Sequence, residues 1–236
     1  MQSLPTQNST PVGPTVDASP AARPQRIPLL GSFVSLVPLD PEAHAKTLYE
    51  GSHGPGTDPL WAYLFDGPYS DLAAFKENLV QKALTDDPLC FAIVDNPSGH
   101  AVGLASYMAI HPLHRTIEVG SILYTPSLQR TPGATEAMYL MARYAFEQLG
   151  YRRYEWKCNA LNAPSRRAAL RYGFTFEGIF RQHMIIKGRN RDTAWFSMLD
   201  SEWPLRRAAF ERWLHSSNFD SSGHQIQALS ALNSSA

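Results

Sequence analysis

A short turn of small and polar residues leads into a helical pattern and has the composition of an anion site. It reads Gln129, Arg130, Thr131, Pro132, Gly133, Ala134 and Thr135. A helix N-terminus exposes unpaired backbone N–H groups and the positive end of the helix dipole, and a turn of small residues can bring both onto a phosphate. Arg130 adds charge, and Thr131 and Thr135 add hydroxyl groups. The same residues also suit an ordinary turn with an N-cap, so the pattern alone leaves both interpretations open.

A carboxylate lies just ahead of this turn, on the strand pattern at 116–125. Glu118 has an apolar neighbour on each side, and desolvation by such neighbours raises the pKa of a carboxyl group. A carboxylate of raised pKa suits a general base that takes a proton from an attacking group. His111 and His114 in the preceding turn are alternative bases. An outward-facing strand glutamate without a catalytic role is the purely structural interpretation of Glu118.

An aromatic segment near residue 65 carries one carboxylate. It contains Trp61, Tyr63, Phe65 and Tyr69 together with Asp66. Aromatic rings beside a carboxylate suit a ligand with an apolar body and a cationic amine. Tyr107 and Trp156, on neighbouring predicted strands, would add to the wall of such a binding site. Packing of the same rings in the hydrophobic core explains their presence at least as well.

The helices and strands that position these residues are predicted from the spacing of apolar residues and from the Gly and Pro residues that interrupt it. The predicted strands are 32–39, 89–95, 101–110, 116–125, 151–159, 174–186 and 191–200. The predicted helices are 41–51, 71–84 with Ser70 as its N-cap, one that opens within 128–137 and ends at Gly150, 163–172 with Asn162 as its cap, and 201–216. The short turns favour an antiparallel meander, followed by a βαβ unit and a hairpin, which is an α+β fold.

Composition excludes several classes of protein. The 236 residues carry 21 Lys and Arg against 21 Asp and Glu, a net charge of +0, which argues against a protein that coats DNA or RNA. No apolar run approaches the roughly 20 residues that span a bilayer. Cys90 and Cys158 lack CxxC spacing, which indicates free thiols in a reducing compartment. We expect a cytoplasmic protein without a metal.

The two ends have the composition of tails. Residues 1–27 are rich in Pro, Ser, Thr and Ala and lack the hydrophobic stretch of a secretory signal. Residues 217–236 are rich in Ser and Asn, although Ile226 to Leu232 could form a terminal helical turn. We therefore expect a folded domain over 28–216, between a disordered N-terminal tail and a flexible C-terminal tail.

Two motifs, taken in order, resemble the GNAT superfamily of acetyl-CoA-dependent N-acetyltransferases, and more narrowly its RimJ/RimL branch. IEVGSILYTPSLQRTPGATEAMYLM (117–141) is similar to the strand–loop–helix motif for the CoA pyrophosphate. RRYEWKCNALNAPSRRAALRYGFTFEGIFR (152–181) is similar to the branch's second signature, a strand, N-x-x-S and a helix closed by GF and an EG. The match covers about residues 30–200. It implies a three-layer α/β/α domain whose mixed, mostly antiparallel central sheet is flanked by helices.

The resemblance also implies roles for single residues. Glu118 would be the general base, and Ser165 the proton donor or a hydrogen-bond donor to the CoA sulfur, unless Ser165 only bonds backbone near the Asn162 cap. Acetyl-CoA would be the co-substrate. Asn162 and the backbones of Ile122 and Tyr124 would bind the pantetheine arm. Further expected ligands lie in the turn and are Gln129, Arg130, Thr131, Gly133, Ala134 and Thr135. Arg167, with Arg166 and Arg171, would bind the 3′-phosphate. Those three arginines also suit a solvated helix face.

Two positions depart from the family pattern. The family loop usually reads (Q/R)-x-x-G-x-(G/A), whereas Pro132 replaces the first glycine here and Gly133 follows one residue late. Proline donates no N–H, so one phosphate contact would be missing. Many GNAT enzymes also place a tyrosine, as proton donor, four residues before the GF glycine. This chain has Ala169 there.

The sequence thus predicts an N-acetyltransferase that moves an acetyl group to a primary amine by direct attack in a ternary complex. A lysine-like amine costs about 4.6 kcal/mol to deprotonate at pH 7, which is why a base is needed. We expect the acceptor to be a small molecule or amino-acid derivative, with a protein N-terminus as the alternative. A non-catalytic acyl-CoA sensor or scaffold and a phosphate-binding module unrelated to CoA are alternatives from other classes. The expected partners are CoA and the acceptor, without nucleic acid or membrane, in a monomer or homodimer.

Overall fold

One eight-stranded sheet organises residues 12–234, the part of the chain that the structure, a computed structural model, describes. The strand order is β1-β2-β3-β4-β5-β6-β8-β7, and every neighbouring pair is antiparallel except β5 and β6. The strands are β1 (Leu29–Leu30), β2 (Val34–Pro38), β3 (Leu89–Asp95), β4 (Ala101–His111), β5 (Thr116–Tyr124), β6 (Arg153–Asn159), β7 (Thr175–Ile186) and β8 (Arg189–Leu199). The predicted α+β class with a mostly antiparallel sheet is confirmed.

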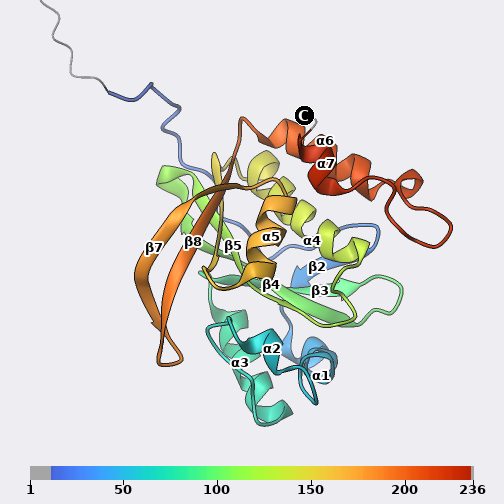
Figure 1. The fold of residues 1–236 in the computed structure, drawn as a ribbon. Helices are drawn as coiled ribbons and strands as arrows, with labels where there is room; N and C mark the ends of the chain where they lie inside the picture. Colours follow the sequence, from blue (N-terminus) through green and yellow to red (C-terminus); the bar gives the residue numbers. More distant parts are fainter. Residues whose placement is uncertain (1–11, 235–236) are drawn as a thin grey trace, which may run out of the picture.

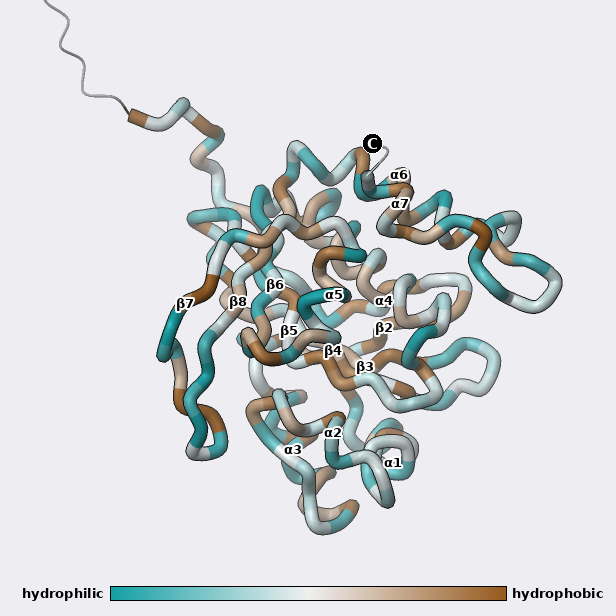
Figure 2. Tube along the Cα trace, in the orientation of Figure 1, coloured by the Kyte–Doolittle hydropathy of each residue, from teal (hydrophilic) through white to brown (hydrophobic). Residues whose placement is uncertain are grey.

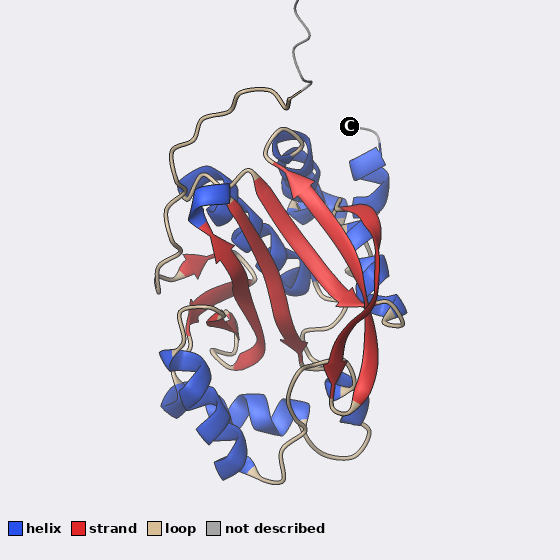
Figure 3. Ribbon diagram, turned by 90° about the vertical axis from the view of Figure 1, so that its left-hand side faces the viewer, coloured by secondary structure: helices blue, strands red, loops and turns tan. Residues whose placement is uncertain are grey.

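Helices cover both faces of the sheet and give the expected three layers. Figure 1 shows α1, α2 and α3 gathered below the sheet and α4 to α7 on its other side, and Figure 3 shows the strands between them after a 90° turn. The helices are α1 (Pro41–Ser52), α2 (Asp58–Trp61), α3 (Leu72–Leu84), α4 (Pro132–Arg143), α5 (Ala163–Arg171), α6 (Trp203–Leu214) and α7 (Leu229–Ser234). A π-helical stretch, Tyr144–Gln148, continues α4.

Two hydrophobic clusters pack on opposite faces of the sheet. The larger joins α4 and α6 to the strands, with Phe91 and Met141 fully buried. The smaller joins α1 and α3 to the sheet through Leu48 and Leu79. Figure 2 shows hydrophobic residues along the central strands and hydrophilic residues along the surface loops. Because helices cover both faces of the sheet, the sequences of the central strands are nearly continuous apolar runs.

Helices α3, α4 and α5 each begin at a side chain that accepts a free backbone N–H of the first turn. Thr131 caps α4, and Asn162 caps α5 as predicted. For α3 the structure differs from the prediction. The carboxylate of Asp71, and not the Ser70 hydroxyl, accepts the Ala74 N–H at 2.9 Å, because the helix begins one residue later than expected.

A buried carboxylate fixes α4 to the start of the sheet. Glu136 accepts the backbone N–H groups of Ser32 at 2.7 Å, Phe33 at 2.6 Å and Val34 at 2.9 Å. A Cβ at Gly31 would lie 2.6 Å from the same carboxylate, so the turn needs glycine there. Hydrogen bonds to an ionised group are short and strong. The turn between β1 and β2 and the first half of α4 therefore form one unit.

The structure departs from the expected N-terminal tail where it describes it. The Ala21 N–H donates to the Pro112 carbonyl at 3.1 Å, and the Gln25 N–H donates to the Tyr144 hydroxyl at 3.2 Å. The Arg26 guanidinium forms an ion pair with Asp86. These contacts use backbone and charged groups, which an apolar period cannot reveal. Residues 1–11 of the predicted tail lie outside the described residues.

The expected C-terminal tail also packs on the body. Helix α7 buries Leu229 and Leu232, and it contacts α5 and α6. The Asn233 side chain donates to the Arg171 carbonyl at 3.0 Å, and Arg206 donates to the Asn233 carbonyl at 2.7 Å. The prediction of a flexible tail is therefore wrong for α7. Residues 235–236 lie outside the described residues.

Candidate active site

Strands β5 and β6 run side by side for only part of their length. They pair from Thr116 with Arg153 to Val119 with Trp156, and beyond these pairs β5 continues to Tyr124 without a partner on the β6 side. The register of β4 against β5 shifts just there, where β5 contains an extra residue. A β-bulge of this kind bends its strand. The bulge leaves the backbone edge of 120–124 open toward β6.

The start of α4 lies directly after this open edge. Pro132 is the first helical residue, a position where the missing N–H would be unpaired in any case and where the fixed φ suits a helix. A Cβ at Gly133 would lie 2.7 Å from the Val34 side chain, so glycine lets the helix start approach β2 closely. Among the described residues, the backbone N–H groups of Arg130 and Gly133 have no partner. This helix start can therefore still receive an anion.

Several side chains expected on the phosphate are used inside the fold instead. The Gln129 amide donates to the Tyr124 carbonyl at 3.0 Å, and the Tyr124 hydroxyl donates to the Ala134 carbonyl at 3.0 Å. The Thr135 hydroxyl is buried and accepts from Arg171 at 3.0 Å. These side chains shape the turn and the helix. The prediction that the Thr135 hydroxyl faces a phosphate is wrong, because it lies on the buried side of α4.

The Thr131 hydroxyl is likewise engaged within the turn. It donates to the Leu128 carbonyl at 2.7 Å and accepts the Ala134 N–H at 3.3 Å. Arg130, next to it, has a positive φ of 61° and an exposed side chain with no contact among the described residues. Arg130 is therefore the side chain of this turn that is free to meet an anion.

Glu118 lies at the point where β5 and β6 part. Glu118 is 8% exposed, and the Lys157 ammonium pairs with its carboxylate at 3.0 Å. Burial raises the pKa of Glu118 above its usual value, although the neighbouring Lys157 charge opposes that shift. The expectation of a buried strand carboxylate with a raised pKa agrees with this geometry.

Lys157 links two glutamates and is a site residue that the sequence reasoning missed. It also pairs with Glu155 at 2.8 Å, and its ammonium lies 4.1 Å from the centre of the Trp195 ring. Arg153 in turn pairs with Glu155 at 2.6 Å and holds the pKa of that carboxyl below its usual value, against the effect of burial. The alternation Arg153, Glu155, Lys157 places all three on one strand face, which was the signal available in the sequence.

Ser165 lies on the other side of β6, at the start of α5. Its hydroxyl accepts the Trp156 indole N–H at 3.0 Å, and its backbone N–H donates to the Asn162 side chain at 3.1 Å. Burial raises the pKa of the neighbouring Cys158 thiol. The structure gives no contact between Ser165 and Glu118.

Part of the aromatic segment packs in the smaller core. The Trp61 indole N–H donates to the Ser52 carbonyl at 2.9 Å, and its ring packs against Tyr69 and Phe75 in the smaller core. Asp66 is paired with Lys82 at 2.6 Å. The expectation that Asp66 offers a free carboxylate to an amine is therefore wrong, because Lys82 neutralises it.

Tyr63 and Phe65 face other parts of the chain. The Tyr63 hydroxyl donates to the Leu161 carbonyl at 3.3 Å and so ties this segment to the loop before α5. The guanidinium of Arg191, on β8, lies 5.1 Å from the centre of the Phe65 ring. The segment is therefore held between β8 and the start of α5.

Two predicted wall residues belong to the core instead. Tyr107 is fully buried, and its hydroxyl donates to the Met141 carbonyl at 2.6 Å. The Trp156 ring packs against Tyr172 and Phe174 under α5. Both predictions fail because successive strand residues point to opposite faces, and these two face α4 and α5.

Comparison with known proteins decides the family. Residues 34–175 match the model of the acetyltransferase (GNAT) domain. The crystal structure of a GCN5-related N-acetyltransferase from Brucella melitensis is 46% identical, with a TM-score of 0.90 over 92% of this chain and 99% of that one. The chain belongs to the GNAT acetyltransferase family.

Other relatives of this GNAT chain agree. A structure from Chromobacterium violaceum, described as a probable acetyltransferase of the GNAT family, is 40% identical with a TM-score of 0.75, covering 86% of this chain and 100% of that one. The uncharacterized N-acetyltransferase YoaA of Bacillus subtilis is 31% identical over 98 residues, or 42% of this chain. That match spans 55% of the length of YoaA. The GNAT family uses acetyl-CoA as co-substrate.

The remaining predicted CoA residues of this GNAT chain lie around the open edge. Ile122 is half-buried on β5 beyond its last pair with β6. Arg167 is exposed on α5, without a contact among the described residues. Arg166 donates to the Ala160 carbonyl at 3.4 Å, and the Arg171 guanidinium lies 4.8 Å from the centre of the Trp213 ring. Arg167 is thus the α5 arginine that stays free.

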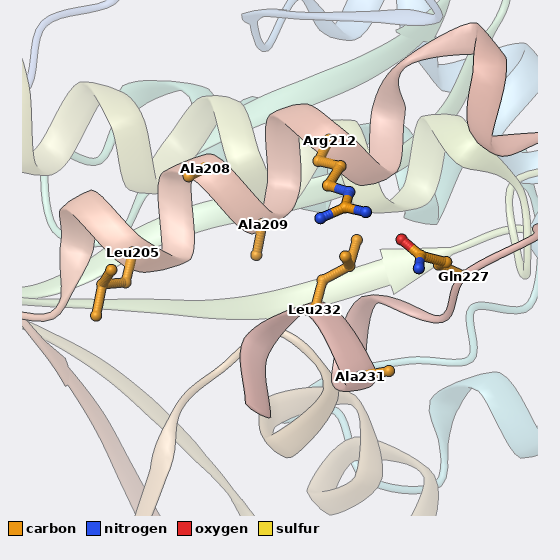
Figure 4. A pocket seen from close by; sticks show the side chains of 7 residues that line it. All are labelled: Leu205, Ala208, Ala209, Arg212, Gln227, Ala231 and Leu232. Carbon is orange, nitrogen blue, oxygen red and sulfur yellow. The ribbon is translucent and has the colours of Figure 1, made fainter. Parts of the chain in front are cut away.

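Other features of residues 12–234 do not add a second centre. No group of three His, Cys, Asp or Glu side chains suitable for a metal occurs in this range. None of the described helices is both long and apolar enough to cross a membrane. A cavity of about 240 Å³ between α6 and α7, lined mainly by Leu205, Ala209 and Leu232 with Arg212 and Gln227 at one side, lacks a nucleophile or base (Figure 4).

Proposed function

We propose that this GNAT chain is an acetyl-CoA-dependent N-acetyltransferase of the RimJ/RimL-like branch that acetylates a primary amine by direct attack in a ternary complex. The observation that carries the proposal is the buried carboxylate of Glu118 at the point where β5 and β6 part. A thioester lying along the open edge of β5 would meet Glu118 at the end of the paired region. The acetyl donor and the proton acceptor would then share one place in the fold.

The residues around the open edge fit the coenzyme. The free N–H groups of Arg130 and Gly133, with the helix dipole of α4, suit a pyrophosphate. The edge of 120–124 that has no partner on the β6 side suits the amide groups of a pantetheine arm, as an added strand would. Arg167 supplies a cation for the 3′-phosphate. The proline at the first helical position leaves these donors intact.

The chemistry assigned to Glu118 is general base catalysis. When the acceptor nitrogen bonds to the thioester carbon, Glu118 takes the proton that the nitrogen loses, and the carbon–sulfur bond breaks to release the CoA thiolate. A positioned base is worth about 10²–10⁴ in rate. Lys157 favours the ionised form of Glu118 against the effect of burial, and a base must be ionised to accept a proton. The leaving thiolate is stabilised by a hydrogen bond from the Ser165 hydroxyl.

A small acceptor suits the cavity next to this site. A cavity of about 350 Å³ lies between α2 and the closed end of the β7–β8 hairpin and reaches Arg191 on β8. Cavities of roughly 300–1,000 Å³ are typical of small-molecule sites. We therefore propose a small molecule or amino-acid derivative as acceptor in preference to a protein N-terminus.

The test is release of CoA from acetyl-CoA with a panel of primary amines. We expect turnover with at least one amine, and we expect Glu118→Gln to lower kcat/KM about 10²–10⁴-fold at pH 7. The deficit should shrink at high pH, where the amine loses its proton without help. Glu42→Gln, which changes an exposed carboxylate paired with Lys76, should behave as wild type. Equal activity of Glu118→Gln and wild type at pH 7 and pH 9 would refute the assignment of the base.

A further inference from the structure

Arg191 is a buried cation without a carboxylate. Arg191 is only 6% exposed. Among the described residues, its side chain makes one hydrogen bond, from Nε to the Thr193 hydroxyl at 3.2 Å. The two Nη groups have no hydrogen-bond or ion-pair partner within residues 12–234. By contrast, Lys157 and Arg153 each pair with two glutamates. The Nη atoms are not among the fully buried unpaired atoms of the described residues, so they remain accessible to an anionic ligand.

Arg191 is one of the residues that line a cavity. The cavity of about 350 Å³ is lined by Trp61 and Ala62 on one side and by the hairpin residues up to Arg191 on the other. Lys187 and Arg189 also line it, against a single carboxylate, Asp58. The lining therefore carries an excess of positive charge, although the whole chain is neutral.

The walls of this cavity are fixed by contacts between distant parts of the chain. The Lys187 ammonium donates to the Trp61 carbonyl at 2.8 Å and joins the tip of the β7–β8 hairpin to α2. The Phe65 ring centre lies 5.1 Å from the Arg191 guanidinium carbon. Arg191 is thus held in place before any ligand binds, which lowers the entropic cost of binding.

The proposed base lies within electrostatic range of this cation. The charge of Glu118 raises the pKa of Arg191 while burial lowers it, and Arg191 in turn favours the ionised form of Glu118. A ligand that meets both residues presents a proton-bearing amine to Glu118 and a negative group to Arg191. Guanidinium and carboxylate match as a bidentate pair.

We propose that the acceptor is an amine that also carries a carboxylate, and that Arg191 binds this carboxylate. The inference rests on the proposed function and narrows its substrate class to amino acids and related amino carboxylates. Lys187 and Arg189 add long-range attraction for the same negative group. Arg191 is a specificity residue here, because it selects the acceptor without taking part in acetyl transfer.

The experiment compares each amino carboxylate with its primary amide, at fixed acetyl-CoA. We expect wild type to prefer the carboxylate about 10- to 100-fold in kcat/KM, the range typical of a charged hydrogen-bond pair. Arg191→Gln should abolish this preference, because KM for the carboxylate rises to that for the amide. Arg191→Lys should keep part of it, since the charge remains but the bidentate geometry is lost. Arg181→Gln, an exposed arginine of the same hairpin outside the cavity, is the matched control.

The outcomes separate this inference from the function on which it rests. Turnover of amines without any preference for the carboxylate, or a preference that survives in Arg191→Gln, would overturn the carboxylate site alone. Absence of turnover with every amine, in protein that binds acetyl-CoA, would overturn the proposed function. In that case, calorimetric titration of CoA-loaded protein with the amino carboxylates and their amides still tests the carboxylate site. The inference stands only if the amino carboxylates bind more weakly to Arg191→Gln than to wild type. Unchanged acetyl-CoA affinity shows that the variant is folded.

Discussion

At the scale of single residues, two opposing effects set the pKa of Glu118. Burial disfavours the carboxylate, and the Lys157 ammonium 3.0 Å away favours it. The net direction is upward, so burial outweighs the ion pair. A base must be ionised to accept a proton, and the acid limb of the rate profile therefore reports this balance.

Replacing Lys157 by Met should shift that limb. Removing the cation leaves burial unopposed, so the pKa of Glu118 rises further and kcat/KM reaches its plateau only at higher pH. The measurement is the pH profile of kcat/KM for the amine turned over by wild type. Lys76→Met, which removes an exposed lysine paired with Glu42, should leave the profile unchanged. An acid limb that stays in place in Lys157→Met would mean that the limb reports another group.

Single-residue roles were predictable where local sequence fixes the environment. The apolar neighbours of Glu118 indicated its burial, and the N-x-x-S spacing indicated the Asn162 cap. Tyr107 and Trp156 were misplaced because both faces of the sheet are covered, so an apolar strand does not show which face each side chain occupies. Arg191 gave no signal, since Phe65 and Glu118, which act on it in the fold, lie far from it in the sequence.

At the scale of elements, the bulge in β5 and the start of α4 form the proposed coenzyme site. The bulge ends the β5–β6 pairing, and Gly133 allows the helix start to lie against Val34. Strand and helix positions were largely predictable from period and turn residues. The bulge was not, because it depends on register with β4, and β1 was missed because two residues are too few to show alternation.

Gly133→Ala should displace the start of α4. The new Cβ would lie 2.7 Å from the buried Val34 side chain, and such overpacking costs about 1–3 kcal/mol. We expect a lower midpoint in urea unfolding and weaker acetyl-CoA binding by calorimetry. Gly13→Ala, where a Cβ meets nothing within 4 Å, is the control and should match wild type in both. Full acetyl-CoA affinity in a destabilised Gly133→Ala would separate the helix start from the coenzyme site.

At the scale of the whole molecule, the described ends of the chain complete the fold on the α4 side. Helix α7 covers α5 and α6, and the segment before β1 follows the body through backbone contacts. Composition predicted tails because apolar residues are sparse in both segments. Two leucines and a few polar bonds nevertheless suffice for α7, whose docking surface is supplied by the domain.

Leu229→Ala should therefore destabilise the entire domain. Leu229 is fully buried, and truncating a buried leucine costs about 2–5 kcal/mol through lost burial and the cavity left behind. Urea unfolding followed by circular dichroism gives the free energy. Leu113→Ala, at a side chain 80% exposed, should stay within about 0.5 kcal/mol of wild type. A change equally small in Leu229→Ala would mean that α7 does not contribute to the stability of the domain.

A crystal structure of the complex with acetyl-CoA would locate the coenzyme. We expect the diphosphate on the Arg130 and Gly133 amides, the pantetheine arm along residues 120–124, and the thioester carbonyl between Glu118 and Ser165. Coenzyme seated elsewhere, such as in the cavity between α6 and α7, or no coenzyme in crystals grown at saturating acetyl-CoA, would contradict this expectation.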